Sequence, residues 1–165
     1  MAGHSIKILG IDPGSSRTGW GLIEKQGGNL KLLDAGIIEI KTKNPNEKLF
    51  YLTRDFQKLL QKTKPKVVAV EKLFFTKNIK TGIEVAQTRG AIILEVTKYK
   101  IPIVELSPSE VKLAVTGYGL SDKKGVAKMV AKILNTEKLV GFDDASDALA
   151  IAIAATNKGI DSQLF

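Results

Sequence analysis

The feature that most constrains this chain is an apolar run that ends abruptly in a carboxylate. Residues 8–11 are Ile-Leu-Gly-Ile, and Asp12-Pro13-Gly14 follows at once. Such a run is typical of a buried strand, and the Pro-Gly pair predicts the turn that ends it. A carboxylate at the end of a central strand must be paired or hold a cation, because a lone buried charge is costly. Asp12 is therefore either a turn residue that bonds nearby backbone amides or part of a site.

A second strand of the same kind lies further along the chain. Residues 66–70 are Lys-Val-Val-Ala-Val, and Glu71 follows them. Open α/β sheets place their chemistry at the ends of their strands. If the two strands lie side by side in parallel, Asp12 and Glu71 meet at one edge of the sheet. Because both strands finish in an acid, the pattern favours a functional site at this edge over a mere turn-forming role for Asp12.

The remaining pattern predicts an α/β protein. Extended segments over 18–24 and 30–41 follow the first strand at hairpin spacing, which predicts an antiparallel meander, and another strand is expected over 102–106. Helical periodicity and end signals predict helices over 44–64, 82–99, 107–116, 121–134 and 141–155. The 165 residues are expected to form one domain, with residues 1–5 and 158–165 as a peripheral leader and tail.

The helix expected over 82–99 is apolar on two sides. Ile83 and Gly90 belong to one stripe, and Ile92 and Val96 belong to another. A surface helix needs only one apolar stripe, so this helix is expected to be covered twice. Small residues at four-residue steps on the first stripe would let another helix approach closely. We interpret this stripe as a homodimer interface, and a third layer of helices is the alternative.

Three acids open the last helix. Asp144 and Asp147 are three residues apart and therefore share one face, while Asp143 is the natural cap. Capping and the helix dipole would be satisfied by one aspartate. We therefore interpret Asp144 and Asp147 as ligands for a cation.

Composition narrows the chemistry further. The chain has no cysteine, and its one histidine, His4, lies in the leader, so zinc sites and histidine-based triads have no residues to use. The net charge of +8 suggests a polyanionic partner, although solubility or a lysine-rich thermophile surface would also account for it. No apolar run is long enough to span a bilayer and no signal peptide is recognisable, so a cytoplasmic location is expected.

Aromatic and basic residues are interleaved after Glu71. Phe74 and Phe75 lie among lysines that include Lys77 and Lys80. This mixture suits base stacking combined with phosphate contact. The alternative is that one phenylalanine belongs to the core and the lysines are simply solvated. We expect Leu73 and one phenylalanine to be buried in the core.

Two lysines, Lys123 and Lys124, lie in the first turn of another expected helix. The helix dipole disfavours cations at that end. We interpret these lysines as facing an external anion, with solvation as the alternative.

The order of elements outlines a ribonuclease-H-like fold, with a central mixed five-stranded sheet flanked by helices. Five motifs, in order and at similar spacing, resemble the RuvC-type Holliday-junction resolvases from Ile8 to about Asn157. These motifs are ILGIDPGSSRTGWG, VAVEKLFFTKN, AQTRG, SPSEVKLAVTGYG and DDASDALAIAIA.

The resemblance implies a dimeric, Mg²⁺-dependent endonuclease that resolves four-way DNA junctions by paired symmetric nicks. The family's four acids fall on Asp12, Glu71, Asp144 and Asp147, and a one-residue shift from Asp144 to Asp143 stays open. Four carboxylates suit two Mg²⁺ ions, with Mn²⁺ as a candidate substitute, and expected products carry 5′-phosphate and 3′-hydroxyl ends. The resemblance also implies the RuvA–RuvB branch-migration complex as a partner.

The same resemblance assigns DNA contacts. The stacking aromatic falls on Phe74, with Phe75 as the alternative, and two lysines near the scissile phosphate fall on Lys112 and Lys123. The remaining expected DNA contacts are Lys77, Lys80 and Arg89.

Three other functions compete with this one. A ribonuclease-H-type nuclease would cut an RNA–DNA hybrid, but the 74–80 loop and the dimer-like helix argue against it. A non-catalytic junction scaffold would lack at least one acid, and none is missing. An actin-like phosphotransferase half would need a second phosphate-binding loop and a partner lobe.

Overall fold

A mixed five-stranded sheet forms the centre of the molecule. The computed structural model describes residues 4–74, 78–137 and 143–160. The strands are β1 (Ser5–Asp12), β2 (Arg17–Gln26), β3 (Asn29–Glu39), β4 (Val67–Glu71) and β5 (Ile103–Leu106). Their order is β3-β2-β1-β4-β5, with β1 to β3 antiparallel and with β4 and β5 parallel to β1. The predicted meander and mixed five-stranded sheet are confirmed.

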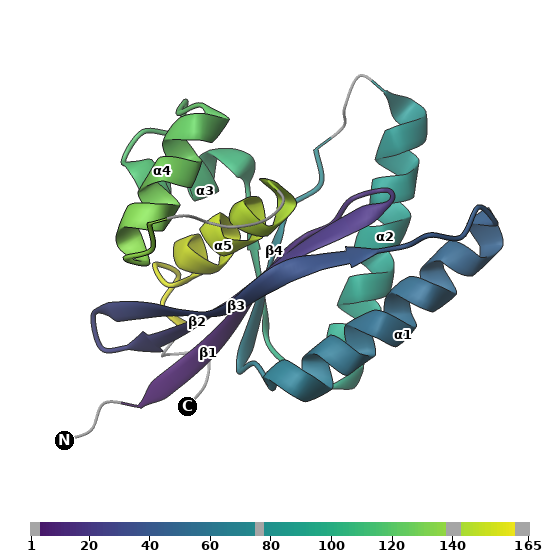
Figure 1. The fold of residues 1–165 in the computed structure, drawn as a ribbon, viewed down its shortest axis with the longest axis horizontal. Coiled ribbons are helices and arrows are strands. Elements are labelled where there is room, and N and C mark those ends of the chain that lie inside the picture. The colour runs from purple at the N-terminus through teal and green to yellow at the C-terminus, as the bar shows by residue number, and fades with distance from the viewer. Residues whose placement is uncertain (1–3, 75–77, 138–142, 161–165) are drawn as a thin grey trace.

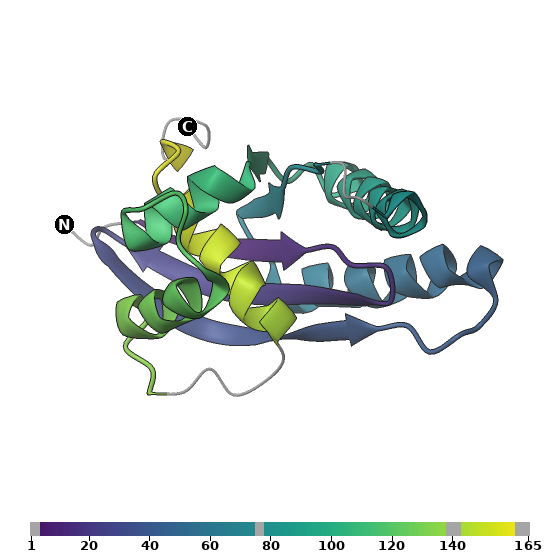
Figure 2. The ribbon, with the colours of Figure 1, turned by 90° about the horizontal axis from the view of Figure 1, so that it is seen from above.

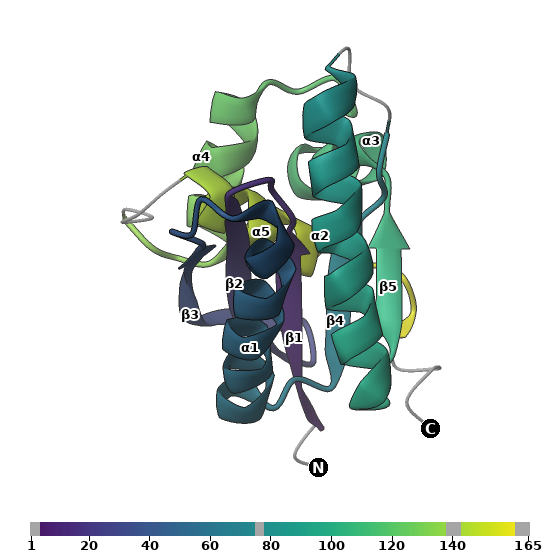
Figure 3. The ribbon, with the colours of Figure 1, turned by 90° about the vertical axis from the view of Figure 1, so that its right-hand side faces the viewer.

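Helices cover both faces of this sheet. They are α1 (Pro45–Thr63), α2 (Ile79–Lys98), α3 (Pro108–Thr116), α4 (Lys123–Ile133) and α5 (Asp143–Ala155). Figure 3 shows α1 and α2 side by side on one face, with α3, α4 and α5 on the other (see also Figure 1). Figure 2 shows α5 crossing the strands, and it contacts both β1 and β2.

Local signals explain where the helices begin and end. Asn44 caps α1 by accepting a hydrogen bond from the Asn46 amide, and the helix stops at Thr63, before Pro65 as predicted. Helix α2 begins at Ile79, three residues earlier than expected, because the Asn78 side chain caps it. Capping therefore moves Lys80 from the expected loop into a helical turn.

Strand alternation divides the core into two layers. On β1, Ile6 and Ile8 pack in the layer beneath α5, while Leu9 and Ile11 pack in the layer beneath α1 and α2. The two-residue period places Asp12 in phase with Ile6 and Ile8. The acid is therefore directed to the face that α5 covers.

Glycines on this face let α5 lie unusually close to the sheet. A Cβ atom built on Gly10 would lie 2.0 Å from the Ala148 carbonyl oxygen, and one on Gly19 would lie 2.0 Å from the Asp144 carbonyl oxygen. At such distances an added side chain at either strand position would force α5 to shift. The sheet glycines thus decide how near the acids of α5 come to Asp12.

Two segments differ from the sequence expectations. Ile160 is fully buried in the α5 core, and Lys158 donates to Glu110 on α3, so this start of the expected tail is packed rather than peripheral. The reason is the apolar side chain of Ile160, which continues the core that α5 forms. Leu73 is exposed rather than buried, because β4 ends at Glu71 and the last backbone bond to the sheet is made by Lys72, one residue before Leu73. Among the helices described, none is long and apolar enough to cross a membrane.

Candidate active site

The ends of two neighbouring parallel strands bring Asp12 and Glu71 together, as predicted. The β1–β4 register pairs Ile11 with Val70, and the two acids are the next residues on their strands. On β4, Val67 and Ala69 face α5, so alternation directs Glu71 to that face too. The two carboxylates therefore lie at the same edge of the sheet and on the same face of it.

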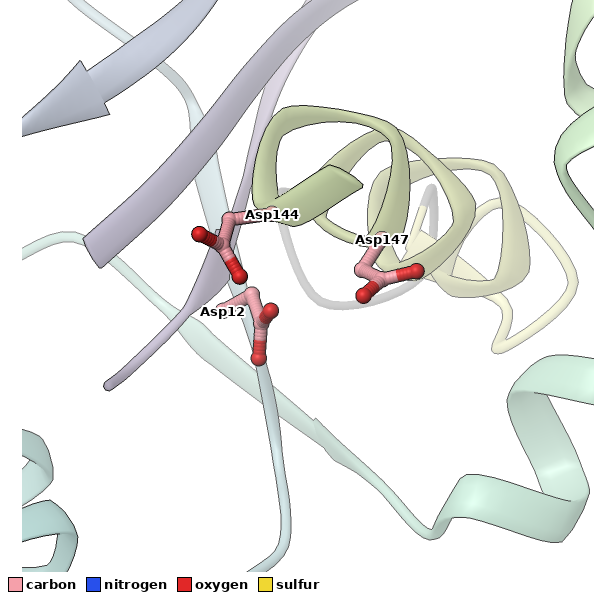
Figure 4. Close-up of side chains that lie close together, drawn as sticks. All are labelled: Asp12, Asp144 and Asp147. Atoms are coloured by element: carbon pink, nitrogen blue, oxygen red, sulfur yellow. The ribbon is translucent and has the colours of Figure 1, made fainter. Parts of the chain in front are cut away.

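The first two turns of α5 add the other two acids. One carboxylate oxygen from each of Asp12, Asp144 and Asp147 lies within 4.8 Å of the others (Figure 4). Asp12 reaches this space from β1, whereas the other two side chains reach it from α5. Glu71 lies outside this set of three but lines the same open cavity as Asp12 and Asp147, which has a volume of about 290 Å³.

Asp143 is placed differently from its neighbour. It is the first residue of α5 rather than a cap preceding it, and its side chain is 86% exposed. Of the two aspartates left open by the sequence, Asp144 is the one that joins the carboxylate set.

Burial and mutual repulsion make the acids hard to ionise together. Burial, with the charges of Asp147, Glu71 and Asp144, raises the pKa of Asp12 to about 7. Burial and the charge of Asp147 raise the pKa of Glu71, and burial raises the pKa of Asp147. A group of carboxylates of this kind is relieved by a bound cation or by protons. Hard oxygen donors with this charge suit a divalent ion such as Mg²⁺, so the residues fit a metal site.

Cationic side chains surround the acids. The Nζ atom of Lys123, the first residue of α4, lies 3.0 Å from Oδ2 of Asp147, and this hydrogen bond raises the pKa of the lysine. Lys112 of α3 lines the cavity and opposes the rise in the pKa of Glu71. Both lysines are therefore at the site, as the resemblance implied, but Lys123 faces an internal anion.

Arg17 is a further cation that the sequence did not single out. Its Nε atom lies 3.4 Å from Oδ2 of Asp144. The only sequence signal for Arg17 is its place just after the Asp12 turn, inside the first motif. The pairing depends on how α5 lies over β2, which no local pattern specifies.

The expected DNA-contact residues lie in different places. Phe74 is 56% exposed beyond the end of β4, and Lys80 is exposed in the first turn of α2. Phe75 and Lys77 lie outside the described residues. Arg89 is only 18% exposed and is bonded within the fold to Glu105, so the structure does not group it with the exposed basic residues.

One face of α2 has no covering layer in the part of the chain that the structure describes. Ile92 and Val96 are buried against the sheet, as one predicted stripe requires. On the other stripe Ile83 is exposed, and a Cβ atom on Gly90 would have no neighbour within 4 Å. The alternative of a third helical layer is wrong for this face among the described residues, because α3 and α4 pack on α5 instead.

The sheet order, the acids that end β1 and β4, and the two acids of α5 define a ribonuclease-H-like nuclease. The family model described as crossover junction endodeoxyribonuclease RuvC matches residues 8–155. The chain therefore belongs to the RuvC family of crossover junction endodeoxyribonucleases.

Relatives and solved structures agree with this assignment. The crossover junction endodeoxyribonuclease RuvC of Syntrophomonas wolfei is 45% identical over 149 residues, which cover 90% of this chain and 87% of that protein. The Thermosipho melanesiensis RuvC is 43% identical, covering 89% and 94%. The structure of T. thermophilus RuvC in complex with a Holliday junction substrate matches with a TM-score of 0.87 and 26% identity, covering 95% of this chain and 96% of that one. The yeast mitochondrial Holliday junction resolvase shares the fold, with a TM-score of 0.64 at 15% identity, covering 96% and 86%.

Proposed function

We propose that this protein is a homodimeric, divalent-metal-dependent endonuclease that resolves four-way DNA junctions by paired symmetric nicks. The observation that carries the proposal is the cluster of Asp12, Asp144 and Asp147 within 4.8 Å, beside Glu71, in a chain of the RuvC family. All four acids of the family pattern are present, which favours catalysis over a scaffold role.

Asp12, Glu71, Asp144 and Asp147 would hold the metal, which we expect to be two Mg²⁺ ions with Mn²⁺ as a substitute. Bound metal would supply activation of water and stabilisation of the leaving 3′-oxygen during in-line displacement, giving 5′-phosphate and 3′-hydroxyl ends. The protein's part is to keep these carboxylates close together and partly buried. Asp12, with its pKa of about 7, must lose its proton before it can act as a ligand near neutral pH.

Lys112 and Lys123 would neutralise negative charge at the scissile phosphate. Both line the cavity that holds Asp12 and Glu71, so a phosphate there would be within their reach. Lys123 is bonded to Asp147 in the protein alone. Cation binding by Asp147 would weaken this bond and free the ammonium group for the phosphate.

Junction contacts would be made at the same edge of the sheet. Phe74 is exposed just beyond Glu71, where a base could stack on its ring, and Lys80 is exposed nearby in sequence to contact phosphate. Phe75 and Lys77 belong to the same proposal. Selectivity for junctions would come mainly from shape and backbone contacts.

Two symmetric cuts require two sites, and each chain has one such acid cluster among its described residues. The uncovered stripe of α2, which carries Ile79, Ile83 and Gly90, is the surface we assign to the dimer. By family resemblance, a RuvA–RuvB complex would deliver the junction to this dimer.

Cleavage of a synthetic mobile four-way junction tests the proposal, with linear duplex and RNA–DNA hybrid alongside, with and without Mg²⁺. We expect paired symmetric nicks in the junction alone, and only with Mg²⁺. Glu71→Gln should bind the junction but not cut it, because a metal ligand is lost while the shape of the surface is kept. Tight binding without cutting under any metal would favour a scaffold, and cutting of the hybrid would leave the fold correct and the substrate wrong.

A further inference from the structure

Arg89 connects α2 to the ends of two strands. Its Nε atom donates a hydrogen bond of 3.1 Å to the backbone carbonyl of Glu71, the last residue of β4. Its Nη2 atom lies 2.6 Å from Oε2 of Glu105 on β5. One guanidinium therefore holds a backbone group of a candidate metal ligand and a carboxylate of the neighbouring strand.

The guanidinium approaches Glu71 from behind the sheet. Val104 and Leu106 pack in the layer beneath α5, so alternation directs Glu105 to the opposite face, the one that α2 covers. The side chain of Glu71 is directed to the α5 face instead, where the other acids lie. Arg89 thus acts on the backbone of Glu71 and leaves its carboxylate free.

Glu71 is a residue whose position needs such support. It is the last residue of β4, and the only ladder contact after it, among the described residues, is the 2.7 Å hydrogen bond that the Lys72 amide donates to the Leu106 carbonyl of β5. Its carboxylate must converge with others that are fixed on β1 and α5. Side chains that orient metal ligands from behind typically change metal affinity 10- to 100-fold when removed.

We propose that Arg89, anchored by Glu105, is a positioning residue that fixes Glu71 for metal binding and does not contact DNA. This inference rests on the metal site proposed above and assigns to Arg89 a role different from the DNA contact expected from the sequence. Its charged, two-point contact is of the kind that arginine makes well and that lysine makes only in part.

The test compares metal binding with junction binding in the intact protein. For Arg89→Gln we expect Mn²⁺ affinity, measured by calorimetry without DNA, to fall about 10-fold. Junction affinity in EDTA should stay within about twofold of the unaltered protein. The Mg²⁺ concentration for half-maximal cleavage should rise, and cleavage at saturating Mg²⁺ should largely recover, because Arg89 does not touch the reacting groups.

Two further variants keep the test decisive. Glu105→Gln is the milder change, because Arg89 itself is mostly buried. In this variant Arg89 keeps its hydrogen bond to the Glu71 carbonyl but loses its ion pair. We therefore expect a smaller loss of Mn²⁺ affinity than in Arg89→Gln. Arg89→Lys should restore part of the affinity. Arg54→Gln removes an arginine that pairs with Asp55 on α1, and this control should leave Mn²⁺ binding unchanged.

The contrary results are distinct from one another. Normal Mn²⁺ binding with weakened junction binding in Arg89→Gln would overturn the proposal and make Arg89 a DNA contact. A lower melting temperature with normal Mn²⁺ binding would overturn it and leave Arg89 a structural residue. If the unaltered protein bound no Mn²⁺, the metal site itself would be wrong, and the role of Arg89 would be lost with it.

Discussion

At Asp12, burial and the charges of three other acids act on a single group. The pKa of this carboxyl is about 7 in the folded protein, against 3.8 for an unperturbed aspartate. Below about pH 4 the group is protonated in both the folded and the unfolded state, and above pH 7 it is ionised in both. Between these values the folded state holds the proton more tightly, so the stability that Asp12 contributes is lost as the pH rises towards 7.

The metal-free protein should therefore be less stable at pH 8 than at pH 5 because of this residue. Asp12→Asn should remove that loss and raise the free energy of unfolding at pH 8 by an amount on the order of 2 kcal/mol. Urea unfolding in EDTA at both pH values measures this. Identical pH dependence in the two proteins would mean that Asp12 does not carry the effect. In the unaltered protein, Mg²⁺ affinity should rise with pH up to about 7, because the metal displaces the proton.

Phe74 is an exposed aromatic beside the site, and its expected role is binding rather than folding. Phe74→Ala should reduce junction cleavage about 5- to 100-fold, since base stacking contributes about 1–3 kcal/mol. Mn²⁺ binding and the melting temperature should not change. The matched control is Phe50→Ala, because Phe50 is an exposed phenylalanine far away in sequence, on α1. This variant should cleave junctions at the normal rate. An unchanged rate in Phe74→Ala would shift the role to Phe75.

At the level of elements, the site depends on how closely α5 lies over β1 and β2. Gly19 pairs with Asp12 across the two strands, and the Asp144 carbonyl lies over the same glycine. The alanines of α5 also help, because Ala148 and Ala152 present little more than backbone to Gly10. Small residues on both elements therefore set the separation between Asp12 and Asp144.

Gly19→Ala should push α5 away from the sheet. The added methyl group would meet the Asp144 carbonyl oxygen at 2.0 Å, a backbone atom that cannot turn aside. We expect a loss of about 1–3 kcal/mol in the free energy of unfolding and weaker Mn²⁺ binding. Gly28→Ala is the control, because a Cβ atom there has no neighbour within 4 Å. Equal effects of the two substitutions on Mn²⁺ affinity would argue against this account of the site.

At the scale of the whole molecule, the two faces of the sheet are covered unequally. Helix α5 is enclosed by the sheet, α3 and α4, whereas α2 packs on the sheet and α1 and leaves one apolar stripe uncovered. Apolar side chains gathered on an uncovered helix face are typical of an interaction surface. The proposed dimer would bury this stripe and keep both sites open.

Ile83→Asp should therefore convert the protein to a monomer, because a carboxylate would be buried at the interface. Sedimentation velocity measures the change, and junctions should then receive single rather than paired nicks. Leu120→Asp alters another exposed apolar side chain, between α3 and α4, and should leave the dimer intact. A dimer that survives Ile83→Asp would place the interface elsewhere.

The strands, the helices and the four acids could be predicted from local patterns in the sequence. The two apolar runs end in Asp12 and Glu71, which places these acids at the ends of their strands. The i, i+3 spacing of Asp144 and Asp147 places both on one face of their helix. Parallel pairing of β1 and β4 then brings the first two acids together, as expected.

The contacts that complete the site, in contrast, could not be predicted from the sequence. The bond from Lys123 to Asp147, the pairing of Arg17 with Asp144 and the hold of Arg89 on Glu71 join residues that lie on different elements. The burial of Ile160 is of the same kind. A local pattern specifies which way a side chain faces on its own element, but not which side chain of another element will meet it. That meeting depends on the distance and angle at which α2, α4 and α5 pack, and these are set by the volumes of many side chains together.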